Sequence, residues 1–326
     1  MELVVVNGAN NISKRVIRSL TKQGVYNKIR LLDFRPYRKS VYAFQREIQA
    51  NGVTVEKHQT TSAQSLDIAL EGADKVVYFT HDYPAMTSDK NNFLVATSKL
   101  AKKHGVSSLV AVAPVEHDLA YSEHDTKSWV ELRAEAEATA LAANKNLTIL
   151  SSDLVFGSRE GYLTPYIAQS AFAGKLPASF FNEAAKFSPI HYEDLARAIA
   201  HKLENAGHGQ FAVRGEEELS IKQLVNVIEK ACGKPEGHTK AKRTLPFEIS
   251  TIIEEFFTGI THDTNMTRLI DTQASGVETI SGANFWEASE LSPEQKLSQF
   301  YRYHAIQELE VAAFPTFAAY KQVSLD

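Results

Sequence analysis

The chain has 326 residues, of which 44% are hydrophobic and 23% charged, and its formal net charge is −4. This composition is typical of a globular protein with a sizeable core, and the length allows two domains, or one larger domain with a smaller cap. The acidic balance argues against a general nucleic-acid binder, which needs clustered positive charge. The only cysteine, Cys232, excludes an intramolecular disulfide and a multi-cysteine metal site.

The first half of the chain alternates short apolar runs with segments of helical spacing. The predicted strands are Leu3–Val6, Ile29–Phe34, Thr54–His58, Lys75–Phe79, Ser108–Val112 and Leu147–Leu150. The predicted helices between them are Lys14–Gln23, Val41–Gln49, Ser65–Leu70, Asn91–His104 and Trp129–Asn144. This alternation predicts an α/β fold, a Rossmann-type doubly wound parallel sheet covered by helices.

The pattern changes near Gly157. A helical stretch over Tyr162–Ala173, a strand over Gln210–Arg214 and a helix over Ile221–Ala231 predict a smaller α/β lobe. We therefore expect three regions, which are a dinucleotide-type domain over 1–157, a substrate-type lobe over 158–239 and a C-terminal extension over 240–326.

The segment after the first strand stands where a glycine-rich phosphate turn opens a helix in dinucleotide-binding folds. Such a turn needs glycines for a tight bend, for close approach to the pyrophosphate and for packing of the helix on the strand. Only Gly8 is kept, because Asn11 and Lys14 take the other two places. Asn11 tolerates left-handed backbone angles, whereas Lys14 must reach outward, push helix and strand apart, or bind a phosphate. Gly8, Asn11 and Ile12 are therefore candidate cofactor contacts in a degenerate turn that either binds weakly or binds nothing.

Charged residues follow the second strand. An acidic residue there bonds the ribose of NAD, whereas a nearby arginine accommodates the 2′-phosphate of NADP. Asp33, Arg35 and Arg38 supply both kinds of group. The two arginines favour NADP(H), bound for structure, if a nucleotide binds at all, and the alternative is a solvated basic loop.

Trp129 and Arg133 stand where short-chain dehydrogenases have Tyr-x-x-x-Lys, and Ala113 stands where they have a serine. In that triad the phenol is the acid or base and the lysine lowers its pKa and holds the ribose. Tryptophan has no ionisable proton near neutral pH, and arginine does not titrate usefully. We therefore expect no catalytic residues and a chain that is not an enzyme, although Arg133 can still anchor a ribose or phosphate.

No metal site is expected either. His117 and His124 lie in an acidic loop without the spacing of metal ligands.

Two apolar segments lie in the last third of the chain. Ile249–Phe257 has the spacing of an amphipathic helix, which either packs on the second lobe or docks on a partner or membrane surface. The tail Phe314–Tyr320 is apolar enough to favour a partner. Both segments predict that the C-terminal third is an assembly surface.

Three stretches carry a resemblance to atypical, extended short-chain dehydrogenases: Leu150–Gly157, Ser188–Ala196 and 268–304. The first two occur in many epimerase-like proteins, and the third is most similar to the family of the NADPH-binding 39-kDa accessory subunit of mitochondrial respiratory complex I. This resemblance implies a non-catalytic accessory subunit with a structural role, held by other complex I subunits. It also implies a location on the matrix side of the mitochondrial inner membrane, with peripheral membrane contact and no nucleic-acid partner.

Two other hypotheses stay open. One is an NADP(H)-dependent oxidoreductase or epimerase of the NmrA-like or isoflavone-reductase-like kind, and the other is a redox sensor that binds dinucleotide without turnover. A native gel separates these classes, because a complex I subunit migrates with a very large membrane assembly and the others migrate as monomers or dimers.

Overall fold

The computed structural model describes residues 1–8, 11–22, 24–33, 39–59, 62–80, 87–115, 126–157, 167–168, 174–242, 261–276 and 279–303. The chain divides into two compact units, each built from separate segments. Unit 1 consists of Met1–Ser152, Tyr192–Arg214 and Ile280–Ser292, and unit 2 of Asp153–His191, Gly215–Thr279 and Pro293–Asp326. The region 240–326 therefore contributes segments to both units.

Unit 1 is built on an eight-stranded sheet in which every pair of neighbouring strands is parallel. The strand order is β14-β11-β6-β5-β4-β1-β2-β3. The strands are β1 (Glu2–Val6), β2 (Lys28–Asp33), β3 (Thr54–Gln59), β4 (Lys75–Phe79), β5 (Ser108–Pro114), β6 (Leu147–Ser152), β11 (Gly209–Val213) and β14 (Ala283–Asn284). The predicted α/β fold with a doubly wound parallel sheet is confirmed.

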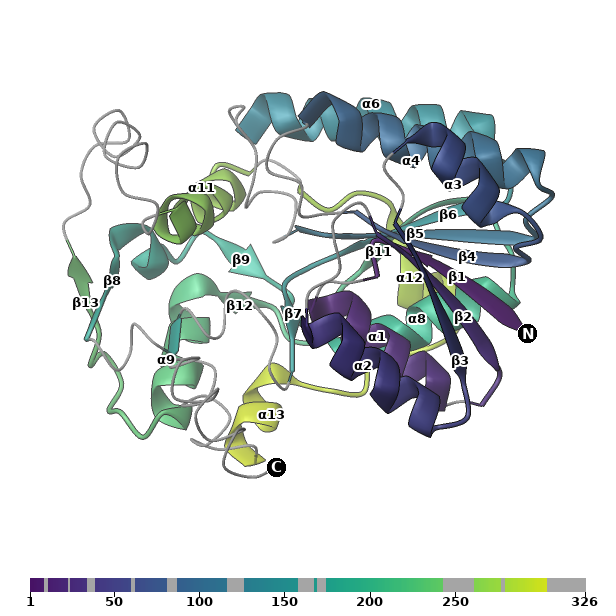
Figure 1. The fold of residues 1–326 in the computed structure, drawn as a ribbon. Coiled ribbons are helices and arrows are strands. Elements are labelled where there is room, and N and C mark those ends of the chain that lie inside the picture. Colours follow the sequence, from purple (N-terminus) through teal and green to yellow (C-terminus); the bar gives the residue numbers. More distant parts are fainter. Residues whose placement is uncertain are drawn as a thin grey trace. The chain divides into compact units, whose positions relative to one another are not determined.

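Helices cover both faces of this sheet (Figure 1). One face carries α1 (Asn11–Lys22), α2 (Lys39–Ala50), α8 (Tyr192–Glu204) and the short α12 (Phe285–Ser289), and the other carries α3 (Ala63–Leu70), α4 (Thr87–Lys103) and α6 (Thr126–Ala143). All seven residues of β5 are buried, as expected for a central strand covered on both sides. No helix in the described ranges is long and apolar enough to cross a membrane.

Unit 2 contains short strand pairs and helices. Its strands are β7 (Val155–Phe156), β8 (Lys175–Pro177), β9 (Lys186–Phe187), β10 (Ile190–His191), β12 (Leu219–Ser220) and β13 (Lys240–Lys242). Its helices are the 3-10 turn η1 (Ala178–Phe181), α9 (Ile221–Ala231), α11 (Thr261–Ala274) and α13 (Leu297–Tyr303). The pairs β7–β10 and β8–β13 are parallel, and β9–β12 is antiparallel.

The helix predicted over Ile221–Ala231 is confirmed as α9, and a capping box between Ser220 and Gln223 begins it. The predicted amphipathic helix at 249–257 and the tail at 314–320 lie outside the described residues. Of the helix predicted over 162–173, only residues 167–168 are described.

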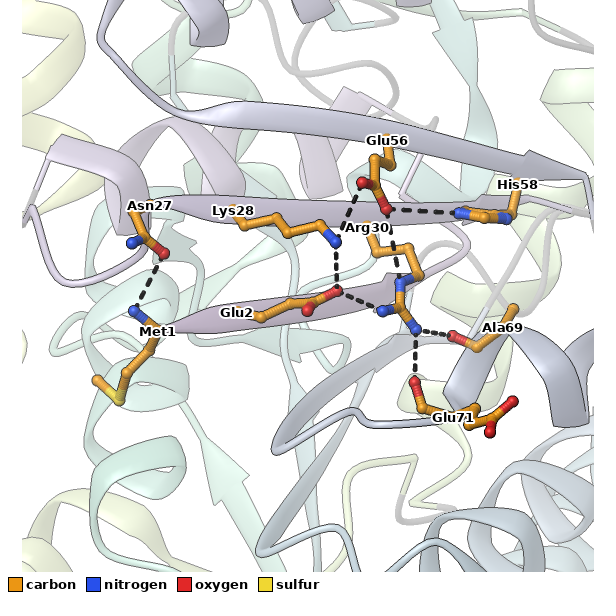
Figure 2. Close-up of polar contacts among 9 residues, drawn as sticks. All are labelled: Met1, Glu2, Asn27, Lys28, Arg30, Glu56, His58, Ala69 and Glu71. Carbon is orange, nitrogen blue, oxygen red and sulfur yellow. Dashed lines mark hydrogen bonds and ion pairs between the residues drawn. The ribbon is translucent and has the colours of Figure 1, made fainter.

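A ladder of charged side chains crosses β1, β2 and β3 (Figure 2). Arg30 on β2 is its centre, because its Nη2 lies 2.6 Å from Glu2 Oε1 on β1. Its Nη1 donates to the carbonyl oxygens of Ala69, at 2.6 Å, and Glu71, at 3.0 Å, which close the C-terminal end of α3. Lys28 joins the ladder to β3 through a 3.0 Å contact with Glu56. Arg30 thus satisfies helix-end carbonyls and ties α3 to the sheet.

Replacing Arg30 with methionine is expected to lower the free energy of unfolding by about 1.5–3 kcal/mol, since charge-assisted hydrogen bonds in a mostly buried setting are lost. The side chain of Arg30 is only 13% exposed, so water does not readily replace those bonds. Urea unfolding of R30M, with the exposed Arg46→Met on α2 as the control, measures the loss. Equal unfolding midpoints for the two variants would show that the contacts of Arg30 do not stabilise the fold.

Candidate functional site

The carboxyl ends of the parallel strands meet at one edge of the sheet. In doubly wound sheets, ligands bind at this edge where the strand order reverses. Here β2 and β3 follow β1 in one direction and β4, β5 and β6 lie in the other, so the reversal falls between β1 and β4. The residues that follow β1 and β4 are therefore the first candidates.

Asn7 joins the strand ends at this point. It has a left-handed backbone, with φ at 61°, and its backbone N–H donates to Leu32 O at 2.8 Å. Its side-chain Nδ2 donates to Phe79 O, the last residue of β4, at 3.0 Å. The sequence reasoning missed Asn7, although an asparagine directly before Gly8 is a signal for such a left-handed turn.

Gly8 allows α1 to approach the sheet closely. A Cβ at this position would lie 2.9 Å from Leu31 Cδ2 and 3.2 Å from Val5 Cγ1, so a side chain here would require these side chains to shift. Gly8 therefore meets the packing requirement of a dinucleotide turn.

The helix that follows the turn begins at Asn11, whose side chain lies outside the description. Ile12 is 2% exposed, so its side chain belongs to the core and only its backbone faces the turn as a candidate contact. Lys14 is 9% exposed and does not extend into solvent.

Asp33 ends β2 beside this turn. The pairing of Val6 with Leu32 puts Asp33 level with Asn7, and Asp33 is 7% exposed. Arg35 and Arg38 lie outside the described residues, so their role at a 2′-phosphate stays a prediction.

Arg133 projects from α6 to the carboxyl ends of β5 and β6. Its Nη2 donates to Ser151 Oγ at 3.1 Å and, more weakly, to Ala113 O at 3.5 Å. Its Nε donates to Glu137 Oε1 at 2.7 Å, one helical turn farther along. The structure therefore brings Arg133 and Ala113 together, as their places in the sequence imply. Trp129 lies on the same helix, but its side chain is not described.

Two serines close β6 and were not singled out from the sequence. Ser151 and Ser152 are fully buried, and Ser151 Oγ contacts Arg133. No hydrogen-bond partner for Ser152 Oγ lies in the described part of the chain. Polar residues at the end of a buried apolar strand are the signal that could have identified them.

Two groups with shifted pKa values lie at the opposite, amino ends of the strands. Burial lowers the pKa of Lys202, whose ammonium lies 4.0 Å from the centroid of Phe211 and whose carbonyl accepts from Ser108 at the start of β5. Burial, reinforced by two carboxylates, raises the pKa of Tyr26 to about 12. These groups are not part of the candidate site.

The residues that the structure describes contain no cluster of histidine, cysteine and carboxylate side chains that could hold a metal ion. The loop with His117 and His124 is not among them.

No protein-family model and no curated protein matches the sequence. Solved structures do match the fold over nearly the whole chain. Triphenylmethane reductase from Citrobacter sp., complexed with NADP(H), has a TM-score of 0.67 at 14% identity and covers 93% of this chain and 99% of its own. The NADPH-dependent quinone oxidoreductase QOR2 from Escherichia coli has a TM-score of 0.64 at 17% identity, with the same coverage. The dTDP-glucose 4,6-dehydratase DesIV from Streptomyces venezuelae has a TM-score of 0.68 at 15% identity and covers 95% and 97%.

These likenesses establish a fold shared with NAD(P)-dependent reductases and dehydratases, and they do not support the expected resemblance to a complex I subunit. The prediction that the chain is not an enzyme is wrong, because the solved structures that share its fold over 93–95% of the chain are enzymes. The error lies in inferring from the missing triad that no hydride is transferred. The Tyr-x-x-x-Lys pair moves a proton, and a hydride acceptor that takes its proton from water does not need it.

Proposed function

We propose that the chain is an NADP(H)-dependent oxidoreductase that transfers hydride to a small electron-poor acceptor, with a quinone as the best candidate class. The observation that carries the proposal is Arg133, held at the ends of β5 and β6 beside Ala113 where a serine–tyrosine–lysine triad would act. The reductase and the quinone oxidoreductase of the same fold, both complexed with NADP(H) or NADPH, support it.

The residues at the strand ends fit a dinucleotide. Gly8 lets α1 approach the sheet, so the backbone of Asn11 and Ile12 at the helix start faces the pyrophosphate position. In this proposal Asp33 binds the adenosine ribose, and Arg35 and Arg38 bind the 2′-phosphate. Arg133 binds the ribose at the nicotinamide end. When bound, the reduced nicotinamide supplies the hydride.

The missing triad favours a reductase over an epimerase or dehydratase. Those reactions begin by removing a proton from a sugar hydroxyl, which requires a base such as the tyrosine that Trp129 replaces. A quinone that accepts a hydride becomes a stabilised hydroquinone anion, and water supplies its proton.

The proposal is tested with purified protein, NADPH and a series of quinones, followed by loss of NADPH absorbance. We expect turnover with NADPH, at least tenfold tighter binding of NADPH than of NADH, and loss of that preference in Arg35→Ala/Arg38→Ala. Arg46→Ala, a change of the same charge on the exposed face of α2, is the control. Absence of NADPH binding and turnover would overturn the proposal. Conversion of a nucleotide sugar with bound NAD would favour the epimerase alternative instead.

The predicted partners, the mitochondrial location and the membrane contact stay predictions from the sequence, and the native gel described above tests them.

A further inference from the structure

Within unit 1, Arg133 is held by a series of hydrogen-bonded polar side chains, in which Glu137 is buried and Gln210 and Ser281 are partly buried. Glu137, one turn farther along α6, is 4% exposed and accepts from Arg133 Nε at 2.7 Å. Its other oxygen, Oε2, accepts from Gln210 Nε2 on β11 at 2.7 Å. The same Gln210 nitrogen lies 2.5 Å from Ser281 Oγ, in the segment that returns to the sheet before β14.

This arrangement fixes the direction of the guanidinium. The guanidinium is a rigid planar fork, so a carboxylate on Nε determines where both Nη atoms point. Here Nη2 is directed to Ser151 Oγ and Ala113 O at the ends of β6 and β5. The position of the Glu137 carboxylate is in turn restricted, because Gln210 donates a hydrogen bond to its second oxygen.

We propose that Glu137 is the positioning residue for Arg133 and that Gln210 acts through Glu137. The affinity for the dinucleotide then depends on the contact of Glu137 with Gln210 on β11. This inference rests on the proposed function, in which Arg133 binds the ribose at the nicotinamide end.

The sign of the effect separates positioning from simple electrostatics. Removing a negative charge near an anionic dinucleotide strengthens binding if only charge matters. Loss of positioning weakens binding, because Arg133 must then be ordered when the ligand arrives. A weaker complex is therefore the expected result.

The experiment measures NADPH dissociation constants, Michaelis constants and melting temperatures for Glu137→Ala, Glu137→Gln and Gln210→Ala. Glu135→Gln is the matched control, since Glu135 lies on the same helix but is exposed. We expect a tenfold or greater rise in the NADPH dissociation constant for E137A and a smaller rise for E137Q, which keeps an acceptor. Q210A should raise it about threefold, and E135Q should leave it unchanged. The KM for the quinone should not change in step with the KM for NADPH.

A second series repeats E137A and Q210A in the Arg133→Lys background, where the rigid fork is absent. Each change should there alter NADPH affinity less than twofold, because the residue through which it acts is gone. Additive effects in this background, or native or tighter binding by E137Q and Q210A, would overturn the proposal. If E137A does not fold, the NADPH dissociation constants of E137Q and Q210A test the proposal. If the native protein itself binds no NADPH, the proposed function fails, which is a distinct result.

Discussion

The Gly215→Ala variant is expected to lose about 3 kcal/mol or more of unfolding free energy, at the upper end of what overpacking costs. A Cβ at this position would lie 1.8 Å from Pro189 O and 2.7 Å from Pro189 C, both backbone atoms. The two segments are also joined by a 2.9 Å hydrogen bond from Gly215 N to Ser188 O, so neither can move away without losing it. Urea unfolding measures the effect.

Gly207→Ala is the control for this substitution. The nearest atoms to a Cβ at Gly207 lie at 3.7 and 3.8 Å, which is ordinary van der Waals contact. The contrast therefore isolates the close approach of the backbone near Pro189. Similar unfolding midpoints for G215A and G207A would show that this approach is not required for stability.

The Arg133→Leu variant is expected to lose about 3–5 kcal/mol of unfolding free energy, because it leaves the Glu137 carboxylate buried without its counter-ion. The side chains of Arg133 and Glu137 are only 11% and 5% exposed. Glu137→Leu should cost a similar amount for the same reason. The double variant Arg133→Leu/Glu137→Leu should be more stable than either single variant, since no uncompensated charge remains.

The exposed ion pair of Lys186 and Glu218 is the control for these variants. Its atoms lie 2.9 Å apart, but the side chains are 60% and 61% exposed, so Lys186→Ala should cost less than about 1 kcal/mol. A double variant no more stable than the two single variants would mean that Arg133 and Glu137 are not held as a coupled pair.

The missing triad was not sufficient to predict the function of the chain. The sequence predicts that Ala113, Trp129 and Arg133 replace the serine, tyrosine and lysine of the triad. The absence of these groups removes one route of proton transfer, and it does not decide whether hydride is transferred. The fold shared with reductases corrected this step.

The sheet of the first half could be predicted from the sequence, because the alternation of apolar strands and helical segments is a local property. The sequence also predicted that Gly8 lies at a turn after β1 and Arg133 on a helix before β6, since both places follow from neighbouring residues.

Contacts between distant parts of the chain could not be predicted from the sequence. Asn7 meets Phe79 across 72 residues, and Gln210 meets Glu137 and Ser281 across 73 and 71. The return of 280–292 to the sheet as β14 and α12 is likewise invisible locally. Periodicity reports which face of an element is buried, but it does not report against which distant residue that face packs. The contacts of Arg133 with Ala113 and Ser151, and of Glu137 with Gln210, therefore follow only from the packing of α6 beside β5, β6 and β11.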